Sequence, residues 1–490
     1  MRENYKNLNE PIVVQNCQET GLCSIDPILN SIEEIFLYEI GQIAYYLTKA
    51  SYFGFKNENA EKQVIEALSF EFASSDLNEE YLKSSLIELV ELKEEIKKGY
   101  LYFCKNSPQG SETINFALEI DPRKPIGRLI KDGEKLIKHK NSLLDIDKNK
   151  YFELITTISR ICAQNLSKIY SYELDYKENR FELIRFFSLR NLYYLKAEKL
   201  KRKILEFSEI IYEIREKTNE VISNYYGKRS ECNIQTTLSK GKSILVCGGD
   251  LKELENILLA IKNSDISVYT HGELLIAHSY EKFKNYKNLK GHYDTGYLKC
   301  DFSNFNGVIY ITKYMSQKIE QVYKGIIISK EKVTPKGVIR NYNNNYDELI
   351  KYTEKYQREE DFNIKTKARL IYDINSIDEV FENKPDDIVV FIGGNNGENL
   401  LDNFGEKKVV NLHYQTDSDL FHYVIEKSQE ANTKLIFFFS KCTKRTISMI
   451  SSLFNKKNIE KIYLIKCPIT NMSPHIVECL NENFGVKIIN

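Results

Sequence analysis

The stretch ILVCGGDLKELENILLAIK, residues 244–262, decides how the second half of the chain folds. Its β-rich run, Ser243 to Cys247, has the length of a buried strand and ends at the pair Gly248–Gly249. An amphipathic segment, Leu251 to Lys262, follows directly. A strand, a glycine turn and a helix in this order are typical of a parallel βαβ unit, so we predict an α/β fold here.

A second stretch, VVFIGGNNG at residues 389–397, repeats this arrangement and is also followed by a helical pattern. Backbone N–H groups converge where a strand turns into a helix, and they can hold an anion there. The turns at Gly248–Gly249 and Gly394–Gly397 are therefore candidate sites for a small anion. Neither turn matches G-x-G-x-x-G or the P-loop, so an ordinary tight turn is the simpler interpretation.

Short runs rich in β-branched and aromatic residues recur through the rest of this half, with helical segments between several of them. We predict strands at Ser243–Cys247, Ile266–Thr270, Val308–Thr312, Ile326–Ser329, Ile388–Gly393, Val409–Tyr414, Leu435–Phe439, Ile462–Lys466 and Val486–Ile489. The segment from Asn341 to Glu382 is polar and rich in Asn and Lys, so we expect a boundary between two α/β domains there.

The first half of the chain carries helical periodicity instead. Asp26 and Pro27 predict an N-cap and a first helical position. We predict further helices at Glu61–Phe72, at Asn78–Gly99 and, in two long pieces, from Phe152 to Tyr226, with loops and one shorter helix at 105–150. The fold class is therefore multidomain α and α/β, with a helical bundle (1–237) followed by two Rossmann-like α/β domains with mainly parallel sheets (238–375 and 376–490).

Composition excludes several classes of protein. The 490 residues include 69 Lys+Arg and 69 Asp+Glu, so the net charge is zero and no basic nucleic-acid footprint is indicated. No apolar run reaches the roughly 18 residues of a membrane span. The polar N-terminus, MRENYKNLNE, is unlike a signal peptide, and the ten cysteines include no CxxC pair. We therefore expect a cytoplasmic protein without a disulfide framework.

The segment VYTHGELLIAHSY, residues 268–280, follows a predicted strand at the sheet edge where α/β proteins place their sites. His271 and Glu273 lie two residues apart, so an extended backbone would point both side chains the same way, and His278 follows. A cluster of His and carboxylate groups can bind a metal or exchange protons, although a buried structural histidine is the simpler interpretation.

This segment resembles V-Y-T-H-G-E-M-L-x-A-H-x-Y of the hybrid-cluster proteins, also called prismane proteins or hydroxylamine reductases, which are distant relatives of the nickel carbon monoxide dehydrogenases. Further segments resemble the same family in the same order: Cys17–Pro27, Ile244–Leu251, Leu289–Tyr293, Ile388–Gly397 and Asn458 to the end of the chain. The resemblance implies a helical first domain and two α/β domains, in agreement with the patterning.

The resemblance also implies an N-terminal [4Fe-4S] cluster and a hybrid 4Fe-2S-2O cluster, at which family members reduce hydroxylamine or nitric oxide. Carried over by position, the hybrid-cluster ligand Glu273 is retained. Gly249, Tyr314 and Asn395 stand where the family has a His, a Cys and a persulfide Cys. The last carboxylate ligand falls near Lys441–Lys444, where no Asp or Glu stands, and two further cysteines fall in a segment that this chain lacks.

At the N-terminus, Cys17 and Cys23 match the last two cysteines of the family's cluster motif, while Asn4–Asn7 stands where its first CxxC would be. Iron–sulfur clusters need about four thiolates or equivalent donors, so we expect no cluster or an incomplete one. The remaining metal-ligand candidates are Glu273, Cys17 and Cys23, unless a second subunit completes a site. His271 and His278 are candidates for an orienting role around the cluster position.

Three functional hypotheses follow. In the first, a degenerate family member has lost the hybrid cluster and the reductase activity and serves anaerobic metabolism by binding or regulation, with a protein partner or a second copy of itself. In the second, the chain is an active iron–sulfur oxidoreductase with altered ligation, and its donors are Glu273, His271, His278, Cys247 and Cys300. In the third, it binds a small anion. By resemblance the chain groups with oxidoreductases, whereas its residue inventory argues against the family's reaction.

Overall fold

The structure is a computed structural model. It describes residues 27–70, 78–105, 116–144, 146–234, 237–293, 302, 305–313, 319, 323–331, 334–341, 345–363, 369–371, 373–383, 385–393, 408–412, 418–440, 443–465 and 474–489. Within these ranges, no helix combines the length and the apolar character that crossing a bilayer requires.

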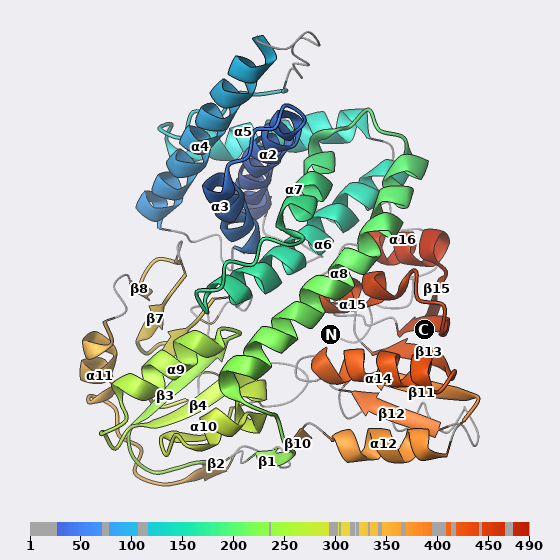
Figure 1. Ribbon diagram of the computed structural model, residues 1–490. Helices are drawn as coiled ribbons and strands as arrows, with labels where there is room; N and C mark the ends of the chain where they lie inside the picture. The colour runs from blue at the N-terminus through green and yellow to red at the C-terminus, as the bar shows by residue number, and fades with distance from the viewer. Residues whose placement is uncertain are drawn as a thin grey trace, which may run out of the picture.

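The first half of the chain is helical, as predicted. Its elements are α2 (Pro27–Ser51), α3 (Glu58–Ser69), α4 (Glu79–Lys105), α5 (Ile126–Leu143), α6 (Ile146–Tyr170), α7 (Arg180–Ser188), the 3-10 helix η2 (Leu189–Asn191) and α8 (Ala197–Tyr226). Figure 1 shows α2 to α7 gathered at one end of the molecule, while α8 runs from this bundle towards the first sheet. Between Phe152 and Tyr226, the two long pieces are α6 and α8, with the short α7 and η2 between them.

Helix α2 begins at Pro27 as predicted, whereas the ends of α3 and α4 correct the sequence analysis. Helix α3 begins three residues before Glu61 because Asn57 caps it by accepting a hydrogen bond from the N–H of Ala60 at 3.0 Å. Helix α4 does not stop at Gly99 and continues to Lys105. Its buried face extends through Tyr100, whose burial in the core outweighs the roughly 1 kcal/mol that a glycine costs inside a helix.

The first sheet is parallel and six-stranded, in the order β5-β4-β3-β6-β7-β8. Its strands are β3 (Ser243–Gly248), β4 (Ser267–Gly272), β5 (Leu289–His292), β6 (Val308–Ile311), β7 (Ile327–Ser329) and β8 (Ile339–Arg340). Its helical segments are α9 (Leu251–Ala260), the 3-10 helix η3 (Glu273–Ser279), α10 (Glu281–Lys284) and α11 (Asp347–Thr353). Numbered along the chain, this order is the 3-2-1-4-5-6 of Rossmann folds, which reverses between β3 and β6.

The second sheet is also parallel and has five strands, in the order β12-β11-β13-β14-β15. Its strands are β11 (Asp387–Ile392), β12 (Lys408–Leu412), β13 (Lys434–Phe439), β14 (Ile459–Ile465) and β15 (Val486–Ile489). Its helices are α12 (Ile374–Glu382), α14 (Ser418–Glu430), α15 (Lys444–Leu453) and α16 (Pro474–Phe484). This is the 2-1-3-4-5 order of doubly wound sheets, which reverses between β11 and β13.

All nine predicted strands are present, and the predicted order of a helical part followed by two parallel sheets is confirmed. The sequence analysis missed β5 and β8, the two outermost strands of the first sheet, and two short antiparallel pairs: β1 (Cys232–Ile234) with β10 (Arg369–Ile371), and β2 (Thr237–Leu238) with β9 (Phe362–Asn363). The later strand of each pair lies in the segment expected to be a boundary. The domain limits near residues 237 and 375 stay predictions.

The helical bundle and the second sheet share one apolar core. Its buried residues run from Leu154 and Ile155 of α6, through Ile211 of α8, to Ile450 of α15 and Phe437 of β13. The first sheet has separate apolar clusters on its two faces, and α8 reaches one of them through Tyr226 at its C-terminal end. Helices α6 and α8 thereby hold the bundle, the first sheet and the second sheet together, in the centre of Figure 1.

Candidate functional site

The carboxyl end of β3 forms a tight turn at the point where the first sheet reverses its strand order. Gly248 has φ +123°, and a Cβ there would lie 2.3 Å from Oγ1 of Thr312 at the end of β6. Only glycine fits this conformation in this space. Asp250 then caps α9, since its carboxylate accepts hydrogen bonds from the N–H groups of Lys252 and Glu253 at 3.0 and 3.1 Å. A side-chain carboxylate therefore already holds the N–H groups considered for anion binding.

Glu273 lies beside this turn, at the carboxyl end of the neighbouring strand. Gly272, with φ +71°, ends β4, and Glu273 begins η3. The Glu273 carboxylate forms an ion pair with Lys168 Nζ at 3.1 Å and a second, close ion pair with Arg445. A Cβ at position 249 would lie only 2.7 Å from Glu273 Oε2, so the carboxylate occupies space that the glycine leaves open.

The two cations reach Glu273 from parts of the chain far from β4. Lys168 lies in the last turn of α6, where a positive charge suits the helix dipole. Arg445 lies in the first turn of α15, where the dipole disfavours a positive charge and an acidic partner compensates. The ion cluster of Lys168, Glu273 and Arg445 therefore joins the bundle to both sheets.

Charges in this ion cluster shift the pKa values of its members. Burial alone would raise the pKa of Glu273, but the charges of Arg445 and Lys168 outweigh burial and hold that pKa at about 2. Burial lowers the pKa of Lys168. Nearby on α8, burial and the charge of Arg445 lower the pKa of Arg215 to about 9. The Arg215 guanidinium lies 5.5 Å from the centre of the Phe421 ring. Glu273 is therefore an anion at any physiological pH.

A small cavity of about 60 Å³ adjoins the ion cluster. Side chains from α6, α8, α9, η3 and α15 line it, including Asn165, Lys168, Asn219, Asp250 and Arg445. This volume accommodates one or two water molecules and no organic substrate.

His271 and His278 have partners other than Glu273. His271 Nδ1 is hydrogen-bonded to the carbonyl oxygen of Tyr293 at 2.7 Å, and its ring meets the edge of Phe302. His278 Nε2 is hydrogen-bonded to Thr270 Oγ1 at 2.9 Å, and burial lowers its pKa to about 4. The left-handed Gly272 interrupts the extended backbone that would have pointed His271 and Glu273 the same way.

Cys247 is fully buried in the apolar cluster that covers one face of the first sheet. An inert thiol is the usual state of a cysteine in such surroundings. The other candidate ligand positions, Tyr314, Asn395, Cys17, Cys23 and Cys300, lie outside the described residues, as do Gly394–Gly397. In the part of the chain that the structure describes, no three His, Cys, Asp or Glu side chains converge on a point that could hold a metal ion.

The sequence analysis missed Lys168 and Arg445, the two partners of Glu273. Lys168 is one of three lysines on the long helix α6, and nothing in its local pattern distinguishes it. Arg445 directly follows the segment Lys441–Lys444, where a carboxylate ligand was expected and basic residues stand instead. That reversal of charge was the one signal that pointed to Arg445.

Comparison with known proteins agrees with this architecture. The sequence model of the Prismane/CO dehydrogenase family matches residues 12–410. The hydroxylamine reductase of Gloeothece citriformis is 27% identical over 308 residues, which cover 60% of this chain and 54% of that protein. Those of Methanocella arvoryzae and Thermodesulfovibrio yellowstonii are 24% and 26% identical over 69% and 66% of this chain. The matches span 54–62% of the length of these relatives. The chain belongs to the Prismane/CO dehydrogenase family.

Proposed function

We propose that this chain keeps the family fold without the hybrid cluster and without hydroxylamine reductase activity, and that it serves as a binding or regulatory protein. The observation that carries this proposal is the pairing of the Glu273 carboxylate with both Lys168 and Arg445. Glu273 is the one hybrid-cluster ligand that the sequence retains by resemblance, and here its charge is already matched by two cations.

Among the described residues, the side chains that contact Glu273 do not fit an iron–sulfur centre. The ammonium of Lys168 and the guanidinium of Arg445 are hydrogen-bond donors without a lone pair to offer a metal. Iron in such centres requires thiolates or comparable ligands. Gly249 offers no side chain, and a histidine there, as in the family, would overlap Glu273 in its present position, since even a Cβ would lie 2.7 Å from Oε2.

The ion cluster connects parts of the fold that a metal centre connects in the family. In the family the hybrid cluster lies between the domains, and here Glu273, Lys168 and Arg445 join η3, α6 and α15. We infer that these ion pairs hold the three parts in place of a metal centre. The carboxylate also fills the position that an external anion would take between the two cations, which argues against anion binding at this point.

A reductase assay tests this proposal. We expect protein purified without oxygen to show no hydroxylamine-dependent oxidation of reduced methyl viologen above the protein-free rate. The hydroxylamine reductase of Thermodesulfovibrio yellowstonii, prepared in parallel, provides the positive control. Sustained turnover by this chain that Glu273→Gln abolishes would overturn the proposal and favour an active oxidoreductase with altered ligation.

As part of the same proposal, we expect the protein to act in the cytoplasm and to bind a protein partner or a second copy of itself. Light scattering of the full chain distinguishes a monomer from a homo-oligomer in which a second copy supplies contacts.

A further inference from the structure

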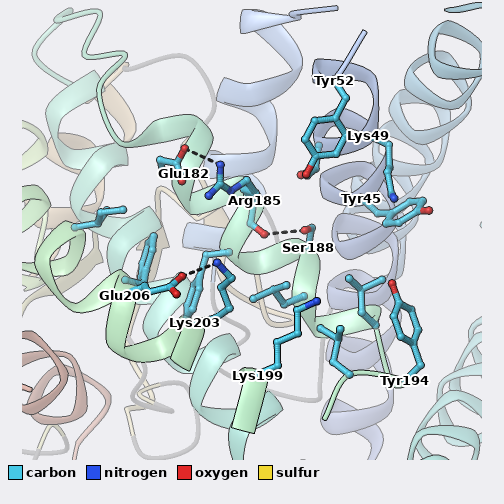
Figure 2. A pocket seen from close by; sticks show the side chains of 17 residues that line it. Tyr45, Lys49, Tyr52, Glu182, Arg185, Ser188, Tyr194, Lys199, Lys203 and Glu206 are labelled. Atoms are coloured by element: carbon cyan, nitrogen blue, oxygen red, sulfur yellow. Dashed lines mark hydrogen bonds and ion pairs between the residues drawn. The ribbon is translucent and has the colours of Figure 1, made fainter. Parts of the chain in front are cut away.

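Helix α8 connects the helical bundle to the second sheet. Its first turns belong to the bundle, where Phe207 stacks on Phe186 of α7 with ring centres 4.0 Å apart. Figure 2 shows Lys203 and Glu206 of these turns paired in the lining of a bundle cavity of about 550 Å³. In the turns that follow, Tyr212 meets α14, which packs on the second sheet. The contact between α8 and α14 therefore joins two parts of the fold, as Figure 1 shows.

A buried histidine lies in this contact. His422 of α14 is 4% exposed, and its ring centre lies 4.3 Å from that of Tyr212. Among the described residues, neither Nδ1 nor Nε2 of His422 has a hydrogen-bond partner. A neutral imidazole carries one donor and one acceptor, and leaving both without a partner costs free energy. An apolar side chain of the same size would avoid this cost, so packing alone does not account for a histidine here.

The charged groups around His422 disfavour a proton on its ring. Burial, and after it the positive charges of Arg215 on α8 and of Lys456 beyond the end of α15, hold the pKa of His422 well below its usual range. The carboxylates of the two helices act on Tyr212 instead. Burial, and after it the charges of three carboxylates on α8 and α14, raise the pKa of Tyr212: Glu426, Glu216 and Glu209. In the described part of the chain, no carboxylate forms an ion pair with His422.

A proton on His422 would add a cation to the side of α14 that meets α8. The ring of Tyr212 already has Lys456 Nζ 3.8 Å from its centre, so its attraction for a cation is in use. The side of α14 that meets the sheet is apolar instead, where the ring of Phe421 lies 5.6 Å from that of Phe437 in β13. Protonation therefore weakens the contact with α8 and leaves the contact with the sheet intact.

We propose that the contact between α8 and α14 is a pH-sensitive switch, closed while the imidazole of His422 is neutral and opened when this ring takes up a proton from solvent. Water solvates the imidazolium once α14 has moved away from α8, whereas the closed contact would bury it without a partner. Opening exposes Tyr212 and the face of α14 that carries His422. The switch involves no metal and no anion, so it does not depend on the proposed function.

A falling pH favours the open contact. In the open state the solvated ring of His422 has the ordinary histidine pKa of roughly 6.5, whereas in the closed state its pKa lies well below that value. Below about pH 6.5, the open state therefore binds one proton more than the closed state. The ratio of open to closed protein then rises by up to about tenfold per pH unit. Between pH 7.5 and pH 5.5 we expect a rise of about tenfold.

Hydrogen exchange followed by mass spectrometry tests the proposal on the full chain at pH 7.5 and pH 5.5, after correction for the intrinsic pH dependence of amide exchange. We expect the protection of α14 and of the second half of α8 to fall by about tenfold at pH 5.5, because both helices open there more often. Helix α9, which packs on the first sheet, provides the internal reference and should keep its protection. Protection of α8 and α14 that is the same at both pH values would overturn the proposal.

Variants at position 422 assign the effect to this ring. His422→Leu removes the titrating group and fills its place with an apolar side chain, so its contact should stay closed at both pH values. His422→Gln is a second variant without a titrating group and keeps the test available if His422→Leu does not fold. His139→Gln is the matched control, because His139 lies exposed on α5, and it should behave like the unmodified protein. A loss of protection at pH 5.5 as large in the position 422 variants as in the control would contradict the assignment.

Discussion

At the scale of single residues, Glu273 links three segments of the chain, η3, α6 and α15. Its carboxylate contacts Lys168 and Arg445, and the charge of Arg215 lies close enough to be affected by it. Removing one charge from such a cluster leaves the others uncompensated in a poorly solvated place, and this is costlier than breaking an exposed ion pair.

Glu273→Gln is therefore expected to lower the free energy of unfolding by roughly 2–4 kcal/mol, measured by urea denaturation followed by circular dichroism. The control is Glu58→Gln, which removes a carboxylate paired with Lys177 at 2.8 Å where both side chains are more than half exposed, and which should therefore cost much less than Glu273→Gln. Adding Lys168→Met to Glu273→Gln should recover part of the loss. Equal costs for the two single variants would show that the cluster does not hold the fold together.

The same residue predicts a pH dependence. The pKa of Glu273 is held at about 2 in the folded protein, below the value of roughly 4.3 for an unfolded chain. Its contribution is therefore complete above about pH 5 and is lost as the pH falls towards 2. The gap between the urea midpoints of the unmodified protein and Glu273→Gln should stay constant from pH 8 to 5 and narrow below. A gap unchanged down to about pH 3 would contradict the shifted pKa.

At the scale of elements, close packing of helices constrains the bundle more than helix propensity does. Gly133 of α5 faces α2 so closely that a Cβ there would lie 2.1 Å from the carbonyl oxygen of Ser31, a backbone atom that cannot turn aside. A Cβ at Gly127 of the same helix would meet no other atom within 4 Å. The two glycines therefore provide a matched pair of substitutions.

Gly133→Ala is expected to lower the free energy of unfolding by about 1–3 kcal/mol, because α5 must move away from α2. Gly127→Ala should instead raise it by up to about 1 kcal/mol, since alanine favours the helix and meets no neighbour. Thermal and urea denaturation of both variants measure the difference. A Gly133→Ala protein as stable as Gly127→Ala would show that the two helices are not packed as described.

Elements with a strong period were predictable from the sequence, and those fixed by tertiary contacts were not. The strands around Val246 and Phe437 could be predicted, because several apolar residues in succession are typical of a parallel sheet that is buried on both faces. The antiparallel pairs at Asn233 and Phe362 have only two or three residues each, too few to show a period. The end of α4 was misjudged at Gly99, since the burial of Tyr100 that prolongs the helix depends on its packing against Tyr46.

At the scale of the whole molecule, the fold could be predicted from local sequence, whereas the charged partners at the candidate site could not. The βαβ pattern and the glycine turns placed Gly249 and Glu273 at one sheet edge, because strand order and the Rossmann turn follow from local sequence. The partners of Glu273 come from α6 and α15, and no local pattern links Lys168 or Arg445 to β4. Only the folded chain brings the three charges together, and with them the argument against a cluster at this position.

The most direct test of this account is the iron and acid-labile sulfide content per chain, measured with the visible absorption spectrum on protein purified without oxygen. The account predicts less than about one iron per chain and no cluster absorption in a protein that unfolds cooperatively. About four irons per chain, lost in Glu273→Gln, would contradict it and would mean that the carboxylate leaves Lys168 and Arg445 to bind a metal centre.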